Sequence, residues 1–249
     1  MKYAARTDVG LVRVNNEDSY LIGEMGDAKI FIVADGMGGH NAGEVASLEA
    51  CRKVEGYILS HRGAAKEVLK AAVECANREI FIHASQNDAM HGMGTTIEAA
   101  LFEEGNITLA HVGDSSVFII SKDDIRKITK DHSVVGMMVE NGTITKEEAR
   151  RHPQRHYITR AVGTAYDIEV DLITEKLNGS EIVLMCSDGL TDMVAQEEIF
   201  DLVRGSESLD KAADALVKTA KEHGGADNIT LILLGSDSTI LSREGKDSR

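Results

Sequence analysis

The 249-residue chain has a single proline, no tryptophan and an aromatic content of only 4%. Hydrophobic residues still make up 43% of the sequence, so we expect a sizeable core built mainly from aliphatic side chains. Cysteine is also scarce. Cys51, Cys75 and Cys186 are too few and too scattered for a disulfide framework or a cysteine-based zinc site, which favours a reducing cytoplasm.

Long hydrophobic runs are absent as well. No apolar run approaches the roughly 20 residues of a membrane-spanning helix, and no apolar region of a signal peptide follows the N-terminal lysine. The net charge of −14 argues against nucleic acid or an anionic membrane as a partner. We therefore expect a cytoplasmic protein that binds neither nucleic acid nor a membrane.

Several catalytic motifs are missing. The chain has no P-loop, no H-E-x-x-H zinc motif and no G-x-S-x-G nucleophile turn. No cysteine is followed six residues later by arginine, so the loop of a cysteine-dependent phosphatase is absent, and no D-x-D pair suggests an aspartyl-phosphate mechanism. These absences disfavour a covalent phosphoenzyme.

Apolar periodicity divides the chain into many strands and a few helices. Strands are predicted at residues 19–23, 29–34, 95–103, 106–112, 115–121, 125–129, 168–174, 181–186 and 228–235. Helices are predicted at residues 42–59, 64–85, 196–204 and 208–223, and a capping box of Thr145 and Glu148 predicts a short helix through Arg151. Strands in hairpin-like succession with grouped helices favour an α+β fold, in which antiparallel sheets carry helices on their outer faces.

The chain shows no linker or repeat before residue 235. We therefore expect a single domain over residues 1–235 and a polar C-terminal tail over residues 236–249. Residues 131–156 are polar and include the short capped helix, so they are expected to form an excursion over the surface, referred to below as the flap.

Acidic residues recur at the ends of apolar stretches. They are Glu17 and Asp18, Asp35 of Asp35-Gly36, Asp114, Asp188 of Asp188-Gly189, and Asp227 of Asp227-Asn228. Each alone is readily explained as a turn residue, because Asp-Gly is a common turn dipeptide. Together they indicate strands that deliver carboxylates to one sheet edge. Clustered carboxylates repel one another unless a cation lies among them, and oxygen ligands favour Mg²⁺ or Mn²⁺ over Zn²⁺.

One arginine and several histidines lie near these acids in the sequence. Arg13 lies four residues before Glu17, where it could form a surface ion pair or bind two oxygens of a phosphate. His111, His132, His152 and His156 are each expected to be structural or surface residues. His40 follows the glycine-rich turn GMGG and is therefore the best placed histidine for proton transfer.

Seven segments, taken in order, resemble those of the PPM/PP2C-type metal-dependent serine/threonine protein phosphatases in their compact bacterial form. They are RTDVGLVRVNNEDS, VADGMGGHNAGEVAS, GMGTTIEAALF, AHVGDSSVFII, ITKDHSVVGMMVENGTITKEEARRHPQRHYITRAVGT, EIVLMCSDGLTDMV and ADNITLILL. They cover about residues 6–234. The resemblance implies two packed antiparallel β-sheets flanked on both sides by helices, with a flap near the active site.

The resemblance also implies a role for each acid. Asp35 would bridge two Mn²⁺ or Mg²⁺ ions, and Gly36 would offer its backbone carbonyl to one of them, with Glu17 nearby. Asp188 and Asp227 would hold the other ion.

Further residues match the surroundings of these two ions. Asp114, together with Asp188, matches the position of a third and weaker metal ion. Arg13 matches the phosphate-binding arginine, and Asp18 and Asn228 would support the ligands.

Two positions depart from the family pattern. Some members carry a histidine directly after Asp-Gly, assigned as the general acid, whereas this chain has Met37. A metal-bound water, His40 or the substrate would then protonate the leaving group. The usual G-D-S-R sequence is G-D-S-S here, with Ser116 in place of arginine. Because that arginine does not bind metal, we expect activity to be retained.

The implied reaction is hydrolysis of a phosphomonoester by direct attack of a metal-bridging water. Substrates would be phosphoserine and phosphothreonine proteins, those of a cognate serine/threonine kinase in a signalling pathway, and the enzyme is expected to be a monomer. One alternative is a pseudophosphatase that binds phosphoproteins without turnover, which would be expected to lack a metal ligand. Another is a phosphomonoesterase acting on small molecules.

Overall fold

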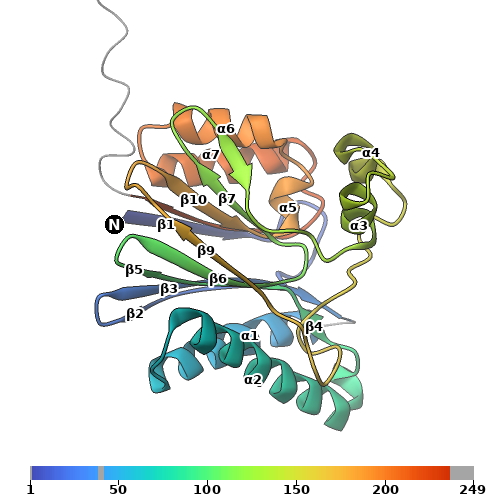
Figure 1. Ribbon diagram of the computed structural model, residues 1–249. Coiled ribbons are helices and arrows are strands. Elements are labelled where there is room, and N and C mark those ends of the chain that lie inside the picture. The colour runs from blue at the N-terminus through green and yellow to red at the C-terminus, as the bar shows by residue number, and fades with distance from the viewer. Residues whose placement is uncertain (1, 39–41, 236–249) are drawn as a thin grey trace, which may run out of the picture.

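The computed structural model describes residues 2–38 and 42–235. These residues form four layers, with two β-sheets packed face to face and a pair of helices on each outer face (Figure 1). The expected α+β sandwich is therefore confirmed. His40 and the predicted tail at residues 236–249 lie outside the described residues.

Sheet A contains strands from both ends of the chain. Its order is β1 (Lys2–Asp8), β11 (Ile229–Gly235), β10 (Ile182–Cys186), β7 (Ser116–Ile120) and β8 (Ile125–Lys127). The pairings are antiparallel. Helices α6 (Gln196–Gly205) and α7 (Leu209–Glu222) cover its outer face, and the one-turn helix α5 (Asp188–Thr191) follows β10 (Figure 1).

Sheet B is built from the intervening chain. Its order is β2 (Asp18–Met25), β3 (Ala28–Met37), β5 (Ile97–Glu103), β6 (Asn106–Val112) and β9 (Asp171–Lys176), with the short β4 (Gly94–Thr95) paired to the end of β3. These pairings are antiparallel as well. Helices α1 (Ala42–Ser60) and α2 (Ala65–Gln86) cover the outer face of this sheet, and the 3₁₀ turn η1 (Asp88–Met90) follows α2.

Three apolar layers hold the sandwich together, and all are largely aliphatic as the composition predicts. The central layer lies between the sheets and includes Phe31, Leu109, Val183 and Ile232. The outer layers join sheet B to α1 and α2, and sheet A to α6 and α7. Because strands β3, β10 and β11 carry buried side chains on both faces, they read in the sequence as nearly continuous apolar runs.

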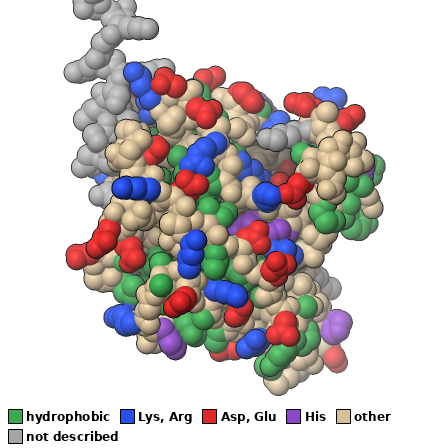
Figure 2. Space-filling view, in the orientation of Figure 1, with side chains coloured by type: hydrophobic (Ala, Val, Ile, Leu, Met, Phe, Trp, Pro, Cys, Tyr) green, Lys and Arg blue, Asp and Glu red, His purple; other side chains and the backbone are tan. Residues whose placement is uncertain are grey.

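The flap stands apart from the sandwich beside α5 (Figure 1). It contains α3 (Val134–Glu140), capped by the Ser133 side chain, and α4 (Lys146–Arg151), whose predicted capping box of Thr145 and Glu148 is present. A bridge between Ser133 and Ile158 closes the base of the flap. Hydrophobic side chains are exposed on the surface formed by these helices (Figure 2), and Met137 is 47% exposed.

Several elements differ from the sequence prediction: the predicted strand at 95–103 is divided into β4 and β5, and η1, β1, α3 and α5 were not predicted. Strand β1 was not predicted, because only Ala4 of its seven residues is buried and its position comes from pairing with β11. Helix α5 is a single turn and α3 has seven residues, which are too short for a helical period to stand out. No helix of the described residues is long and apolar enough to cross a membrane.

Candidate active site

The acidic residues at the strand ends converge at one edge of the sandwich. Asp18, the first residue of β2, is the register partner of Asp35 near the end of β3. Asp188 begins α5, two residues after the end of β10, and Asp227 lies two residues before β11. The charges of these residues and of Asp114 act on the Asp35 carboxyl group, so acids from both sheets form one group.

This crowding disfavours the charged forms of the acids. Burial, followed by the charges of Asp18 and Asp188, raises the pKa of Asp35 well above its usual value. Burial and then the charge of Asp114 raise the pKa of Asp188. The pKa of Asp18 is raised to about 6 by burial. Burial and the neighbouring Asp131 raise that of Asp114 to about 7. The group is therefore strained electrostatically without a cation.

Gly36 lets three backbone segments approach one another. Its amide donates to the carbonyl of Glu17 over 3.1 Å. A Cβ atom on Gly36 would lie 2.1 Å from the Gly43 carbonyl oxygen and 2.5 Å from that of Glu17, so a larger residue does not fit. Gly43 in turn packs against the Glu17 side chain, because its own Cβ would lie 2.8 Å from the carboxyl carbon. Glu17 is therefore beside Gly36.

Two threonines hold the backbone of Asp35. The Asp35 amide donates to the Thr96 hydroxyl oxygen (3.0 Å), while the Thr96 amide and the Thr95 hydroxyl both donate to the Asp35 carbonyl (2.9 Å each). Both threonines are fully buried. They were not singled out from the sequence, since two hydroxyl residues at the start of an apolar strand carry no distinctive pattern.

Asn228 fastens the loop that carries Glu17. Its side-chain NH₂ group donates to the carbonyls of Val9 (3.0 Å) and Asn15 (2.9 Å), and its side-chain oxygen accepts from the Glu17 amide (2.8 Å). One buried side chain thus joins the beginning and end of the chain.

Asp18 is held from sheet A. The Ser187 hydroxyl donates to its carboxylate over 2.7 Å and accepts from the Thr230 amide over 3.0 Å. Asp18 is 8% exposed, so it lies behind the group rather than at its surface.

Arg13 lies at the surface of the acidic group. Its guanidinium donates to the Asp227 carboxylate over 2.8 Å, and its side chain is 51% exposed. The hydrogen bond to Asp227 raises the pKa of Arg13, and the charges of Glu17 and Asp35 add to this effect. Of the two readings of Arg13, the ion pair is present, and its exposure leaves the guanidinium accessible to a ligand.

Asp192 was missed in the sequence, although it has the helical i, i+4 spacing from Asp188. The two carboxylates and the ring of His156 from the flap each offer an atom within 4.8 Å of the others. His156 is exposed, as a surface residue would be. Its closeness to the carboxylates of Asp188 and Asp192 was not predicted from the sequence.

The root of the flap contacts the loop that carries Asp114. The Gly113 amide donates to His132 Nδ1 over 3.0 Å, and the Arg160 guanidinium lies 3.0 Å from His132 Nε2. The His132 ring packs against His111, with ring centroids 4.5 Å apart, and His111 is bound to the fully buried Glu98 over 2.5 Å. Both histidines are therefore buried within a network of polar contacts.

The two residues that depart from the family pattern, Met37 and Ser116, both lie in strands. Met37 ends β3 and pairs with Gly94 of β4. Ser116 is buried at the start of β7, and its hydroxyl oxygen has no hydrogen-bond partner. A serine therefore occupies a site that leaves its polar group unsatisfied.

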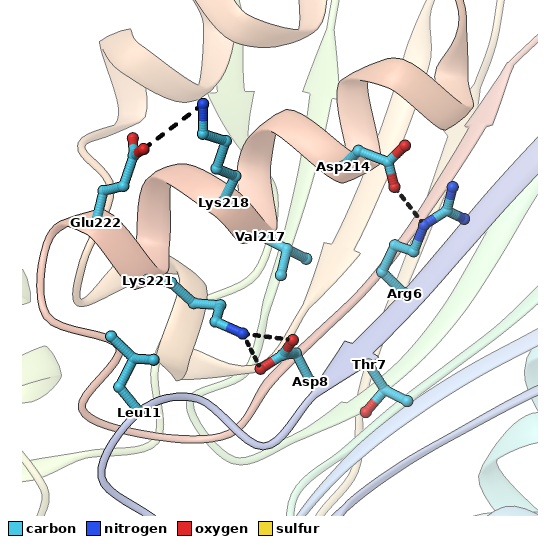
Figure 3. A pocket seen from close by; sticks show the side chains of 9 residues that line it. All are labelled: Arg6, Thr7, Asp8, Leu11, Asp214, Val217, Lys218, Lys221 and Glu222. Carbon is cyan, nitrogen blue, oxygen red and sulfur yellow. Dashed lines mark hydrogen bonds and ion pairs between the residues drawn. The ribbon is translucent and has the colours of Figure 1, made fainter.

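A surface groove of about 560 Å³ lies elsewhere, between β1 and α7 (Figure 3). Its charged side chains are paired with each other: Lys221 with Asp8, Arg6 with Asp214, and Lys218 with Glu222. None of the predicted site residues lines it. The acidic group, rather than this groove, is therefore the candidate for chemistry.

The acidic group fits divalent metal ions. Its donors are carboxylate and carbonyl oxygens, the ligands that Mg²⁺ and Mn²⁺ prefer. One oxygen of Asp114, Oδ1, is buried without a hydrogen-bond partner, which a cation would provide. A bound cation would also offset the burial and mutual repulsion that raise the pKa values of Asp35 and Asp188.

Comparisons with known proteins identify the family of the chain. The family model described as "Protein phosphatase 2C" matches residues 12–230. The serine/threonine phosphatase stp of Listeria monocytogenes is 36% identical over 249 residues, covering 98% of each chain. The crystal structure of the phosphatase Stp1 from Staphylococcus aureus superposes with a TM-score of 0.90 at 35% identity, covering 94% of each chain.

A third relative contains metal. The catalytic domain of the serine/threonine protein phosphatase PstP, solved in complex with two manganese ions, matches with a TM-score of 0.83 at 36% identity, covering 93% of this chain and 96% of that one. Given the matched family, the near-complete coverage and the converging acids, the chain belongs to the protein phosphatase 2C family and is a metal-dependent serine/threonine protein phosphatase.

Proposed function

We propose that the acidic group holds a pair of Mn²⁺ or Mg²⁺ ions. Asp35 would lie between the two ions, the Gly36 carbonyl and Glu17 would face one, and Asp188 and Asp227 would face the other. The observation that carries the proposal is the convergence of carboxylates from both sheets on Asp35. Asp114 with Asp188 would hold a third and weaker ion.

Arg13 is proposed to bind the phosphate of the substrate. Its guanidinium is bound to Asp227 and is half exposed. Metal ligation by Asp227 would compete for that carboxylate and free the arginine. A guanidinium beside a cationic centre can then bind two phosphoryl oxygens in a fork, which also orients phosphorus for in-line attack.

The residues around the acids position them for this chemistry. Bound ions supply positive charge that activates a water molecule and stabilises the phosphoryl oxygens. Thr95 and Thr96 fix the backbone of Asp35, and Asn228 fixes the loop of Glu17. Asp18, held by Ser187, would orient the neighbouring ligands. The phosphomonoester would be hydrolysed directly.

The leaving-group oxygen of serine or threonine requires a proton. Met37, at the position of the histidine in some relatives, has none to give. A metal-bound water, His40 or the substrate itself would supply it, and His40, three residues further along the chain, is the candidate that a substitution can test. His40→Gln should therefore lower activity on a phosphopeptide more than on p-nitrophenyl phosphate, whose leaving group is far more acidic.

The proposed substrates are phosphoserine and phosphothreonine proteins of a cognate kinase in the cytoplasm, dephosphorylated by a monomeric enzyme. Nucleic acid and anionic membranes are not proposed as partners, because the net charge of −14 would repel them. A phosphoproteome of a deletion strain would identify the substrates, because their phosphorylated forms should accumulate.

The test is hydrolysis of p-nitrophenyl phosphate and of a phosphothreonine peptide. Activity should require Mn²⁺ or Mg²⁺, disappear in EDTA, and fall about 100-fold or more in Asp35→Asn. Asp201→Asn, on the exposed face of α6, is the matched control and should retain full activity. Full activity in EDTA would contradict the metal mechanism, and turnover of small esters alone would point to a small-molecule phosphomonoesterase.

A further inference from the structure

His132, at the root of the flap, holds both backbone polar groups of Gly113. The His132 amide donates to the Gly113 carbonyl over 2.8 Å, and the Gly113 amide donates to His132 Nδ1 over 3.0 Å. His132 is only 8% exposed, so water does not compete freely for these hydrogen bonds. The next residue after Gly113 is Asp114. One residue of the flap therefore fixes the backbone that leads into this acid.

The hydrogen bond from the Gly113 amide requires one form of the His132 ring. Nδ1 has to be an unprotonated acceptor, so the neutral ring carries its proton on Nε2. Nε2 lies 3.3 Å from the Asp171 carboxylate, which accepts that hydrogen bond. Asp171 also accepts from the Arg160 guanidinium over 2.7 Å. The two partners on the Nε2 side thus orient the ring so that Nδ1 faces Gly113.

Thr96 confines the same loop from the other side. The φ of Gly113 is +113°, and a Cβ atom there would lie 2.5 Å from Thr96 Cγ2. The Thr96 hydroxyl lies 2.8 Å from that of Ser115 and accepts from the Asp35 amide over 3.0 Å. Asp114 therefore has a firmly held residue on each side, and the threonine that holds them also holds Asp35.

His132 also joins the two chain segments at the base of the flap. Its carbonyl accepts from the Thr159 amide over 2.8 Å, and the adjacent Ser133 forms the bridge to Ile158. A displacement of the flap root would therefore pull on Gly113 through two hydrogen bonds.

We propose that His132 is a positioning residue that sets the direction of the Asp114 carboxylate through Gly113. Within the described part of the chain, Asp114 Oδ1 is buried without a hydrogen-bond partner, so this carboxylate takes its direction from the backbone on either side. The inference rests on the proposed role of Asp114 as a ligand of the weakest metal ion. It links the position of the flap root to the affinity for that ion.

Two amide substitutions separate this role from simple packing. Asparagine places its side-chain oxygen near the position of Nδ1 and can accept from the Gly113 amide, whereas glutamine places its polar atoms near Nε2. In His132→Gln the Mn²⁺ concentration that gives half-maximal hydrolysis of p-nitrophenyl phosphate should rise about tenfold or more. The KM for the ester should stay unchanged, because Arg13 is not affected. His132→Asn should keep the wild-type Mn²⁺ dependence, although its side chain is smaller.

Ser133→Ala is the matched control. It removes the cap of α3 at the adjacent buried residue without touching Gly113, so the Mn²⁺ dependence should not change. An unchanged Mn²⁺ dependence in His132→Gln would overturn the inference. A shift of equal size in His132→Asn or in Ser133→Ala would overturn it as well, because packing alone would then explain the effect.

Nuclear magnetic resonance of the wild-type protein gives a readout that does not depend on how the variants fold. In Mg²⁺, which is diamagnetic, a scalar coupling should join the ¹⁵N nuclei of the Gly113 amide and His132 Nδ1 across their hydrogen bond, and its absence would contradict the proposed role. The proposed function is tested separately, because EDTA sensitivity and the loss of activity in Asp35→Asn do not depend on His132.

Discussion

Gly36 lacks a Cβ atom, and this absence allows the backbone segments of the site to pack together. A Cβ there would meet only backbone atoms, the carbonyl oxygens of Gly43 and Glu17, which cannot move independently of α1 and the loop before β2. Gly36→Ala should therefore lower the melting temperature and weaken Mn²⁺ binding. Gly56, in the C-terminal part of α1, has open space around it, so Gly56→Ala should stabilise the protein by about 0.5–1 kcal/mol. Thermal unfolding of the two variants checks the contrast, and equal effects would contradict it.

Asn228 stabilises the site through three hydrogen bonds from one amide group. Asn228→Ala removes all three at a buried position, so we expect a loss of roughly 2–4 kcal/mol in the free energy of unfolding. Urea denaturation in EDTA measures this effect without a contribution from metal. The exposed Asn141 provides the control, and Asn141→Ala should change the free energy by less than about 0.5 kcal/mol.

The predictability of the site differs from residue to residue. Asp35, Asp114, Asp188 and Asp227 could be singled out because each ends or precedes an apolar strand, and strand ends meet at sheet edges. Their assignment to particular ions came from the resemblance and stays a prediction. Thr96 could not be singled out, because its hydroxyl oxygen accepts from the Asp35 amide only once β3 and β5 lie side by side.

At the scale of elements, the strongly periodic segments were predictable and the weakly periodic ones were not. The predicted strand at 106–112 and helix at 208–223 correspond closely to β6 and α7, because apolar side chains mark their buried faces. Strand β1 has little apolar pattern, and its hydrogen bonds to β11 come from the opposite end of the chain. A long-range pairing of this kind leaves no local signal in the sequence.

The flap helices should be individually weak, because α3 and α4 lie outside the three apolar layers. Thr145→Ala removes the capping box and should speed hydrogen exchange of α4, at a local cost of about 1 kcal/mol. The melting temperature should stay nearly constant, since the sandwich unfolds independently of this cap. Thr143→Ala changes an exposed threonine two residues earlier and should leave exchange unaltered. A large fall in melting temperature would show that the flap belongs to the cooperative unit.

For the whole molecule, the metal-free acids make stability depend on pH. The pKa of Asp18 is raised to about 6 and that of Asp114 to about 7, so the folded state binds their protons more tightly than the unfolded chain does. This stabilisation is complete below the ordinary aspartate pKa of about 3.9 and is lost as the pH rises through 6 and 7.

In EDTA the melting temperature should therefore fall between pH 5 and pH 8. Asp114→Asn should flatten the part of this fall near pH 7, while groups elsewhere contribute equally to both proteins. Saturating Mn²⁺ should raise the melting temperature most at pH 8, where the carboxylates are charged. A pH dependence unchanged by both Asp114→Asn and Mn²⁺ would contradict the electrostatic account.

The two sheets contribute opposite halves of the acidic group. Asp18 and Asp35 belong to sheet B, whereas Asp188 and Asp227 flank strands of sheet A. The spacing of the halves is thus set by the thickness of the apolar layer between the sheets, where Val183 and Ile232 lie. Hydrocarbon side chains that never touch solvent or substrate in this way determine how far apart the enzyme holds its charges. Sequence drift in that layer would tune catalysis without altering any group that takes part in it.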